Sequence, residues 1–173
     1  YFQHGWGARH GALAGAGVAD GRDASAAALN PASLVNAGNS VQIAVSLFSP
    51  NRSTTGSGQP GLAPIGKVDS VTNFFLVPNI AYSKQIDENS AWGITIYGNG
   101  GMNSDYPAVD RALAECGGGS GVFCGGAAGV NLSQGFIAPG YARNFGKITI
   151  GITPLIVMQM FEAKGLGAFA GFS

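Results

Sequence analysis

The sequence predicts an all-β fold: an antiparallel transmembrane β-barrel, of which this chain supplies about five strands behind an N-terminal plug. Three observations carry this prediction. Only 10% of the 173 residues are charged, against about 25% in ordinary soluble domains. Although 46% of the residues are hydrophobic, no run approaches the ~18 consecutive apolar residues of a membrane-spanning helix. The apolar residues instead alternate with small or polar ones, as in strands that face lipid on one side only.

The first forty residues are rich in Gly and Ala, have few large side chains and show no strand pattern. Such a segment is poorly suited to a core of its own, but its small residues allow backbones to pack closely. We therefore expect residues 1–40 to be a hatch, meaning a plug inside the barrel that residues 41–173 help to form. Asp23 is expected to cap a short helix over 24–29. Asn30 is expected to cap a following turn that begins Pro31-Ala32. These are capping roles in preference to ligand contacts.

Alternating runs mark the strands in chain order. The clearest run, 41–47, places Val41, Ile43, Val45 and Leu47 on one face. The further predicted strands are 73–84, 91–98, about 133–143 and 148–160, of which the last is the longest. The residues predicted to face lipid are Val41, Ile43, Val45, Ile94, Ile96, Ile150 and Ile152.

The connections alternate in length. Residues 85–90 and 144–147 make short turns, whereas 49–72 and 100–132 are long loops rich in Gly, Ser, Asn and Pro. Outer-membrane barrels have short periplasmic turns and long extracellular loops. Tyr82 and Trp92 lie close to a short turn, where an aromatic girdle belongs. A soluble meander can show the same alternation but gives no reason for aromatics at the strand ends. The sequence therefore predicts a bacterial outer-membrane location.

About five strands cannot close such a barrel, because the smallest membrane barrels have about eight and an open edge in lipid leaves backbone groups unpaired. Either the chain is one piece of a longer protein, which we favour, or it oligomerises to close the sheet. The expected partners are outer-membrane lipid and the remainder of its own barrel or another chain. The net charge of +0 gives no reason to expect nucleic acid.

Several segments, taken in order, resemble FadL-type outer-membrane transporters. They are Phe2-Gln3, Gly11–Gly17, Asp23–Ser25, Asn30–Ala32, Pro78-Asn79, Trp92–Tyr106 and Phe161–Leu166. The resemblance implies a barrel of about fourteen strands, within the even-numbered range of such proteins. It also implies passive uptake of long-chain fatty acids or aromatic hydrocarbons, with lateral exit through a gap in the barrel wall.

The resemblance further implies two groups of site residues. Tyr1 and Phe2 match the N-terminal tip, which in that family lies beside the ligand pocket and moves when ligand binds; a frayed chain terminus is the alternative interpretation of these two residues. Gly98, Asn99, Gly100 and Gly101, which end the third predicted strand, are the best candidates for the kink that opens the wall, since glycine weakens strand pairing. An ordinary turn into the long loop explains the same four residues equally well.

Cys116 and Cys124 lie close together in the second long loop, and such a pair in an exported loop predicts a disulfide. A metal site would need more ligands than this loop offers, and we interpret His4 and His10 as polar contacts within the hatch. No Ser-His-Asp or paired-carboxylate arrangement is recognisable, so we expect neither an enzyme nor a cofactor. The alternative function is that of a structural or partner-binding envelope protein, which uses its Gly-rich loops as docking surfaces without transport.

Overall fold

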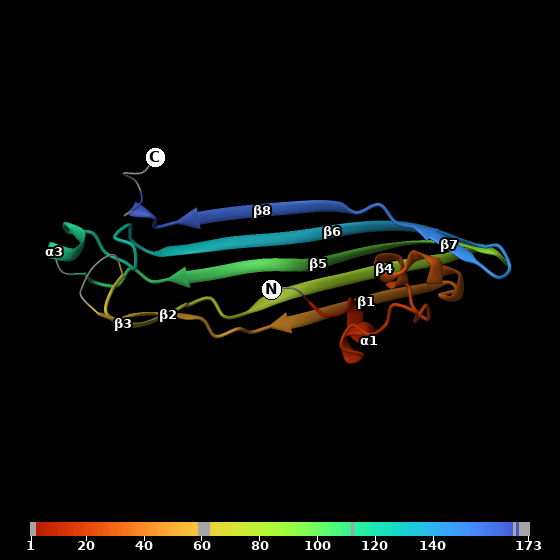
Figure 1. Cartoon of the computed structure of the whole chain (residues 1–173), viewed down its shortest axis with the longest axis horizontal. Helices are drawn as coiled ribbons and strands as arrows, with labels where there is room; N and C mark the ends of the chain where they lie inside the picture. Colours follow the sequence, from red (N-terminus) through yellow and green to blue (C-terminus); the bar gives the residue numbers. More distant parts are fainter. Residues whose placement is uncertain (1–2, 59–62, 112, 168, 170–173) are drawn as a thin grey trace. The chain divides into compact units, whose positions relative to one another are not determined.

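The computed structural model describes residues 3–58, 63–111, 113–167 and 169. The described part of the chain is mostly β-structure (Figure 1). Its strands are β1 (Ser40–Phe48), β2 (Ser53–Gly56), β3 (Gly66–Asp69), β4 (Phe75–Asp87), β5 (Ser90–Tyr106), β6 (Ala128–Asn144), β7 (Thr149–Ile152) and β8 (Ile156–Lys164). Its helices are α1 (Gly7–Ala12), α2 (Ala26–Leu29), the 3-10 helix η1 (Pro31–Asn36) and α3 (Leu113–Cys116). Within the described ranges, none of the helices combines the length and the apolar character needed to span a bilayer.

The main sheet follows the order β1-β4-β5-β6-β7, and β8 also pairs with β6 (Figure 1). The register is antiparallel: Ile80 of β4 lies opposite Ile96 of β5, and Tyr141 of β6 lies opposite Ile152 of β7. β2 and β3 form a separate two-stranded antiparallel sheet. The predicted all-β, antiparallel class is confirmed. The sheet of this chain is open, so closure into a barrel stays a prediction.

The second long loop is shorter than predicted, and the first contains strands. β5 continues to Tyr106 and β6 begins at Ala128, so the loop expected over 100–132 spans only 107–127 and contains α3. The loop expected over 49–72 contains β2 and β3. Gly, Ser and Asn indicate loops only on average, and neighbouring strands can impose extended structure on them. The two short turns lie where the sequence predicts them.

The prediction of one long strand over 148–160 is wrong. Residues Thr149–Ile152 form β7, residues Ile156–Lys164 form β8, and the chain between them is not in a strand. Pro154 lies at this break, and proline has no backbone N–H to donate to a neighbouring strand. Alternation of apolar residues on both sides of the proline concealed the interruption. The longest strands are β5 and β6, with 17 residues each.

The chain forms two compact units, each of which is described by itself. The first comprises Tyr1–Leu47, Leu76–Gly100 and Gln134–Gln159, and it contains α1, α2, η1 and the strands against which they pack. The second comprises Phe48–Phe75, Gly101–Ser133 and Met160–Ser173, and it contains the β2–β3 hairpin and the cysteine-containing loop.

The hatch segment packs onto one face of the sheet in the first unit. Its core cluster consists of small residues around Leu34, which is fully buried. A Cβ at Gly93 would lie 2.9 Å from Leu34 Cδ2, and a Cβ at Gly140 would lie 3.0 Å from Leu34 Cδ1. Glycine at both positions therefore lets η1 approach β5 and β6 closely. Enclosure of this segment by a complete barrel stays a prediction.

Hydrogen bonds from two threonine side chains, one in β5 and one just after β7, reach the hatch backbone near α2. Thr95 Oγ1 donates to the carbonyl of Ala24 at 3.3 Å, and Thr153 Oγ1 donates to the carbonyl of Ala27 at 2.8 Å. The Ala24 carbonyl also accepts from the Ala27 amide at 3.4 Å, so the bond from Thr95 is a second one to the same oxygen.

Of the two predicted helix caps, the one at Asn30 is confirmed and the one at Asp23 is wrong. Asn30 Oδ1 accepts from the Ala32 amide at 3.2 Å, with Pro31 at the first position of η1, as expected. The N-cap of α2 is Ser25, whereas Asp23 Oδ1 accepts from the Ser25 amide at 2.9 Å. Asp23 therefore closes an Asx-type turn that leads into α2 and is not the helix cap.

The interpretation of His10 as a polar contact is wrong. Its side chain is fully buried, and neither ring nitrogen has a hydrogen-bond partner among the described residues. A Cβ at Gly17 would lie 2.9 Å from Nε2 of the ring, so glycine is required for the chain to pass beside it. His10 thus serves as a packing residue between α1 and the following turn.

Candidate functional site

The hatch-facing side of β5 and the first described residues of the chain form the candidate site. Strand alternation points Gly93, Thr95, Tyr97 and Asn99 toward the hatch. Tyr97 and Asn99 are 5% and 3% exposed. Both side chains are thus covered in this structure, Asn99 by Gln3 and Tyr97 by aromatic rings.

Gln3 connects this surface to the N-terminal end of the chain. Its backbone N–H donates to Asn99 Oδ1 at 2.7 Å, and its side-chain Nε2 donates to Ser46 Oγ of β1 at 2.7 Å. One residue therefore anchors the beginning of the hatch to two strands of the sheet. Tyr1 and Phe2, the predicted tip, lie outside the described residues.

An aromatic series continues from the hatch across the sheet. The Trp6 ring meets Tyr97 edge-on, with centroids 5.1 Å apart and planes at 88°. Tyr97 in turn stacks on Phe136 of β6, with centroids 5.1 Å apart and planes at 9°. Both arrangements are favourable for aromatic pairs. The sequence reasoning missed this cluster, because the three residues come from distant segments. Pairing of β5 with β6 brings Tyr97 to Phe136, and packing of the hatch on the sheet brings Trp6 to Tyr97.

The run Gly98–Gly101 does not end a strand, which corrects the sequence prediction. It lies inside β5, which continues for five residues beyond Gly101. The paired residues of β4 and β5 run from Asp87↔Ser90 to Asn79↔Tyr97, so Gly98 lies just beyond the last pair. Pro78 precedes Asn79 on the facing strand and has no amide N–H to extend the pairing.

The glycines of this run differ from one another. Gly100 has a φ of +86°, and a Cβ there would overlap the Gln134 side chain. Only glycine fits that position easily. Gly98 has no positive φ, and a Cβ there would lie 3.2 Å from Val77 Cγ1. Gly100 thus marks an irregularity inside β5, whereas at Gly98 the backbone conformation suits any residue and a side chain requires a small shift of Val77.

The hatch motif Asn30-Pro31-Ala32 has a structural role. Asn30 Nδ2 donates to the Val18 carbonyl at 3.0 Å while its Oδ1 caps η1. A Cβ at Gly151 would overlap the backbone of Ala32, so β7 and η1 meet backbone to backbone. The motif fixes the hatch against the sheet and offers no side chain for a ligand.

Charge on the hatch is concentrated at Asp20. Its carboxylate accepts from Arg22 Nε at 2.7 Å and from Arg9 Nε at 2.8 Å. The hydrogen bonds from Arg22 first, and then from Arg9, hold the pKa of Asp20 well below its usual range. These three side chains join α1 to the turn that precedes α2.

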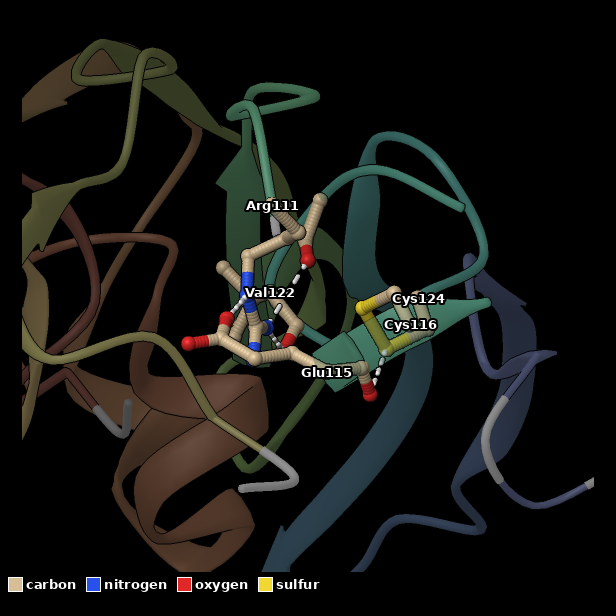
Figure 2. The surroundings of a disulfide bond; sticks show 6 residues. Arg111, Glu115, Cys116, Val122 and Cys124 are labelled. Atoms are coloured by element: carbon tan, nitrogen blue, oxygen red, sulfur yellow. Dashed lines mark hydrogen bonds and ion pairs between the residues drawn. A yellow bond between two sulfur atoms is a disulfide. The ribbon is translucent and has the colours of Figure 1, made fainter. Parts of the chain in front are cut away.

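Cys116 and Cys124 are joined by a disulfide, which confirms the prediction (Figure 2). Arg111 lies beside it with a side chain only 1% exposed. Its guanidinium pairs with Glu115 at 2.9 Å and donates to the carbonyls of Gly121 and Val122 at 3.3 and 3.1 Å. The loop between β5 and β6 is therefore internally ordered by a covalent link and a buried arginine.

The second unit contains a hollow of about 430 Å³ that the sequence analysis did not anticipate. Most of its lining residues are polar, and they come from β5, β6, β8 and the segment Thr72–Phe75, where β4 begins. No sequence signal identified it, because its residues are spread over four segments. Among the described residues, no group of three or more His, Cys, Asp or Glu side chains is placed to hold a metal ion.

Comparison with known proteins identifies the family of the chain. The model of one family, described as outer membrane protein transport protein (OMPP1/FadL/TodX), matches residues 3–122 of the 173. Comparison with the curated proteins and with the solved structures gave no match. The family match covers more than half of the chain: residues 3–40 of the hatch segment, strands β1 to β5, and helix α3 with Cys116, the first cysteine of the disulfide. The chain therefore belongs to the OMPP1/FadL/TodX family of outer membrane transport proteins.

Proposed function

We propose that this chain forms part of an outer-membrane barrel that takes up hydrophobic compounds by passive diffusion and releases them sideways through its wall. Its family is one of outer membrane transport proteins, and that membership supports a hydrophobic substrate. Long-chain fatty acids and aromatic hydrocarbons are the two substrate classes proposed.

The observation that carries the proposal is the inverted distribution of polarity across the sheet. Ile43 and Ile152 are 74% and 68% exposed, whereas Ser83 and Thr95 are completely buried under the hatch. A soluble sheet buries its apolar face and hydrates its polar one. The reverse arrangement is stable where lipid covers the apolar face, as on the outside of a membrane barrel.

The proposed exit lies beside Gly98, where pairing between β4 and β5 gives way to Pro78. A lateral exit is physically preferable for a hydrophobic solute, since each methylene that enters water costs about 0.8 kcal/mol. Passage through the wall into the membrane avoids that cost. The aromatic series of Trp6, Tyr97 and Phe136 then lies on the inner side of the same stretch of β5.

Filling the exit tests the route. We expect Gly98→Leu to reduce uptake of a labelled fatty acid or of toluene by intact cells, because the new side chain extends toward Val77 and Pro78. Gly135→Leu is the matched control: it adds the same bulk to β6, where a Cβ meets only Met158 at 3.8 Å. Equal uptake by Gly98→Leu, Gly135→Leu and the unmodified protein contradicts a lateral exit here.

The tip is the second part of the proposed mechanism. Deleting Tyr1 and Phe2 removes the proposed gate but leaves the two bonds of Gln3 to Asn99 and Ser46 available. We expect altered uptake or ligand affinity at unchanged thermal stability. If both ligand classes enter the deletion variant at the normal rate, gating by the tip is wrong.

Enclosure of the hatch is tested by trypsin. The Arg22 side chain is 71% exposed in the open sheet of this chain, so it is cleavable there unless the completed barrel shields it. We expect the protein in intact membranes to resist cleavage at Arg9 and Arg22. Rapid cleavage at either arginine, with β-structure retained, rules out a plug inside a barrel.

The alternative is a structural or partner-binding role. It is favoured by the ordered loop around Arg111 and the disulfide, which offers a preformed surface without any need for transport. Cells that lack the protein and take up both substrate classes at the normal rate, yet lose envelope integrity, support this role in place of transport.

A further inference from the structure

The two halves of the hatch are held on the sheet by unequal contacts. Around η1, the fully buried Leu34 packs against Gly93 and Gly140. The buried residues of α1 are Gly7 and His10, so this helix places no large apolar side chain against the sheet. Six residues with two glycines also form a weak helix, and no side chain caps its start. The α1 half of the hatch therefore lacks the packing that fixes the η1 half.

α1 begins against a buried asparagine of β4. Asn79 is 5% exposed, and neither polar atom of its amide group has a hydrogen-bond partner among the described residues. A Cβ at Gly7 would lie 3.2 Å from Asn79 Oδ1, so the first residue of α1 lies on this amide. The ring nitrogens of His10 in the same helix are buried without partners too. Burial of these groups is unfavourable, because they have lost water and gained no bond in exchange.

This contact lies on the inner side of the proposed exit. Asn79 pairs with Tyr97, and this is the last pair of β4 and β5 before Gly98. Trp6, the residue before α1, packs edge-on against Tyr97. The start of α1 therefore covers the wall at the point where strand pairing ends.

The contacts that hold α1 in place are polar. Gln3, ahead of the helix, bonds to Asn99 and Ser46, and Arg9 of α1 pairs with Asp20 at 2.8 Å. The Arg9 side chain is 39% exposed, and partly exposed ion pairs contribute little to stability. Segments with few buried apolar contacts open locally at lower cost than the packed core of the same protein.

We propose that α1 is a lid that opens separately from the rest of the hatch and uncovers the inner side of the exit beside Gly98. α2 and η1 stay packed on the sheet as the fixed base of this lid. Opening hydrates the amide of Asn79 and the ring of His10, so the two buried polar side chains lower its cost. The inference rests on the proposed lateral exit and adds to it the segment that moves.

Amide hydrogen exchange of the detergent-extracted protein measures the opening. The amide of Gly15 donates to the carbonyl of His10 at 2.9 Å and reports on α1. The amide of Ala37 donates to the carbonyl of Leu34 at 3.0 Å and reports on η1. After correction for intrinsic rates, we expect Gly15 to exchange about 10-fold faster than Ala37, or more. Equal protection of the two amides overturns separate opening of α1.

Apolar replacements that keep the shape of the buried groups are expected to close the lid. Leucine has the branching of asparagine without its polar atoms, so Asn79→Leu removes the unfavourable burial. We expect exchange of Gly15 to slow about 5- to 50-fold, at unchanged exchange of Ala37, and uptake of labelled toluene by intact cells to fall. His10→Leu removes the other buried polar group and is expected to change both readouts in the same direction. Asn51→Leu is the matched control, since Asn51 is exposed and belongs to the second unit.

Gly7→Ala tests the lid in the opposite direction. Gly7 has a φ of +78°, and a Cβ there would overlap the Gln42 side chain, so alanine is expected to speed exchange of Gly15 and to raise uptake. The proposal is overturned if exchange of Gly15 is unchanged or faster in folded Asn79→Leu and His10→Leu. It is also overturned if all three variants take up toluene at the rate of the unmodified protein. Failure of the proposed function is distinguishable: cells with the unmodified protein then take up no more toluene than cells that lack it, while exchange still decides whether α1 opens separately.

Discussion

The two faces of the sheet in the first unit use the same strands but follow opposite rules. On the face beneath the hatch, glycine, serine and threonine are buried because η1 lies close to the sheet: its Leu34 side chain meets β5 and β6, and its backbone at Ala32 meets β7. On the other face, isoleucine and valine are exposed along β1 and β7. The hatch face depends on close fit, whereas the apolar face depends on the solvent that covers it.

This difference teaches that one substitution has different consequences on the two faces. Removing atoms from the hatch face leaves a cavity, because the packed backbone cannot follow. Removing atoms from the apolar face leaves no cavity, because lipid tails fill the space. A charged substitution, unlike a truncation, is strongly destabilising on the apolar face, but only where that face lies deep in the membrane.

The largest expected effect is on the hatch face. Leu34→Ala removes a fully buried side chain that contacts Gly93 and Gly140, and we expect a loss of about 2–5 kcal/mol in the free energy of unfolding. Val41→Ala is the matched truncation on the apolar face, where Val41 is 67% exposed, and a much smaller loss is expected. Equal losses in urea titrations of the lipid-embedded protein contradict the distinction between the faces.

The next effect concerns charge at the middle of β1. Ile43 is 74% exposed at a central position of Ser40–Phe48, and Ile43→Arg is expected to cost about 2–4 kcal/mol in a bilayer, as at the midplane of membrane barrels. Ile150 lies opposite Arg143, close to the short turn between β6 and β7, so Ile150→Arg is expected to cost only about 0–1 kcal/mol. Unfolding in lipid vesicles measures both. An unchanged stability of Ile43→Arg shows that this face does not contact lipid.

The loop between β5 and β6 depends on neither face. The disulfide closes a short covalent ring and stabilises the folded chain by about 2–3 kcal/mol in the chain-entropy model. Replacing Cys116 and Cys124 by serine removes that contribution. We expect faster proteolysis within 107–127 and unchanged cleavage at Arg22. Thiol labelling of the unreduced, denatured protein is the control and should detect no free cysteine. Two labelled thiols contradict the disulfide.

The smallest expected effect is that of pH on the hatch. Because Arg22 and Arg9 lower the pKa of Asp20 in the folded protein, their pairing stabilises the hatch at pH values above the ordinary value of 3.8. That contribution is lost as the pH falls from 3.8 toward the lowered folded pKa. Asp20→Asn should therefore reduce the difference in hatch protection between pH 7 and pH 3, measured by amide hydrogen exchange over α1. An identical difference in Asp20→Asn and the unmodified protein shows that Asp20 does not carry the effect.

The sequence by itself determined several parts of this protein. Alternation of Val41, Ile43 and Val45 predicts both the strand and its apolar face, because successive strand residues point to opposite sides. Asn30 before Pro31 predicts the start of η1, and the spacing of Cys116 and Cys124 predicts their bond. The order of hatch and strand segments was sufficient to recognise the family. Each of these signals acts over a short stretch of chain or over a fixed order of stretches.

Only the tertiary structure decided the rest. Gly98–Gly101 has the composition of a loop but lies inside β5, because pairing with neighbouring strands overrides weak local propensity. The contact of Trp6 with Tyr97 and Phe136, and the place of Arg52 beside Asn103, join residues far apart in the chain. Such contacts depend on strand register and on where the hatch meets the sheet. Local alternation specifies which face a residue is on but not which distant residue lies beside it.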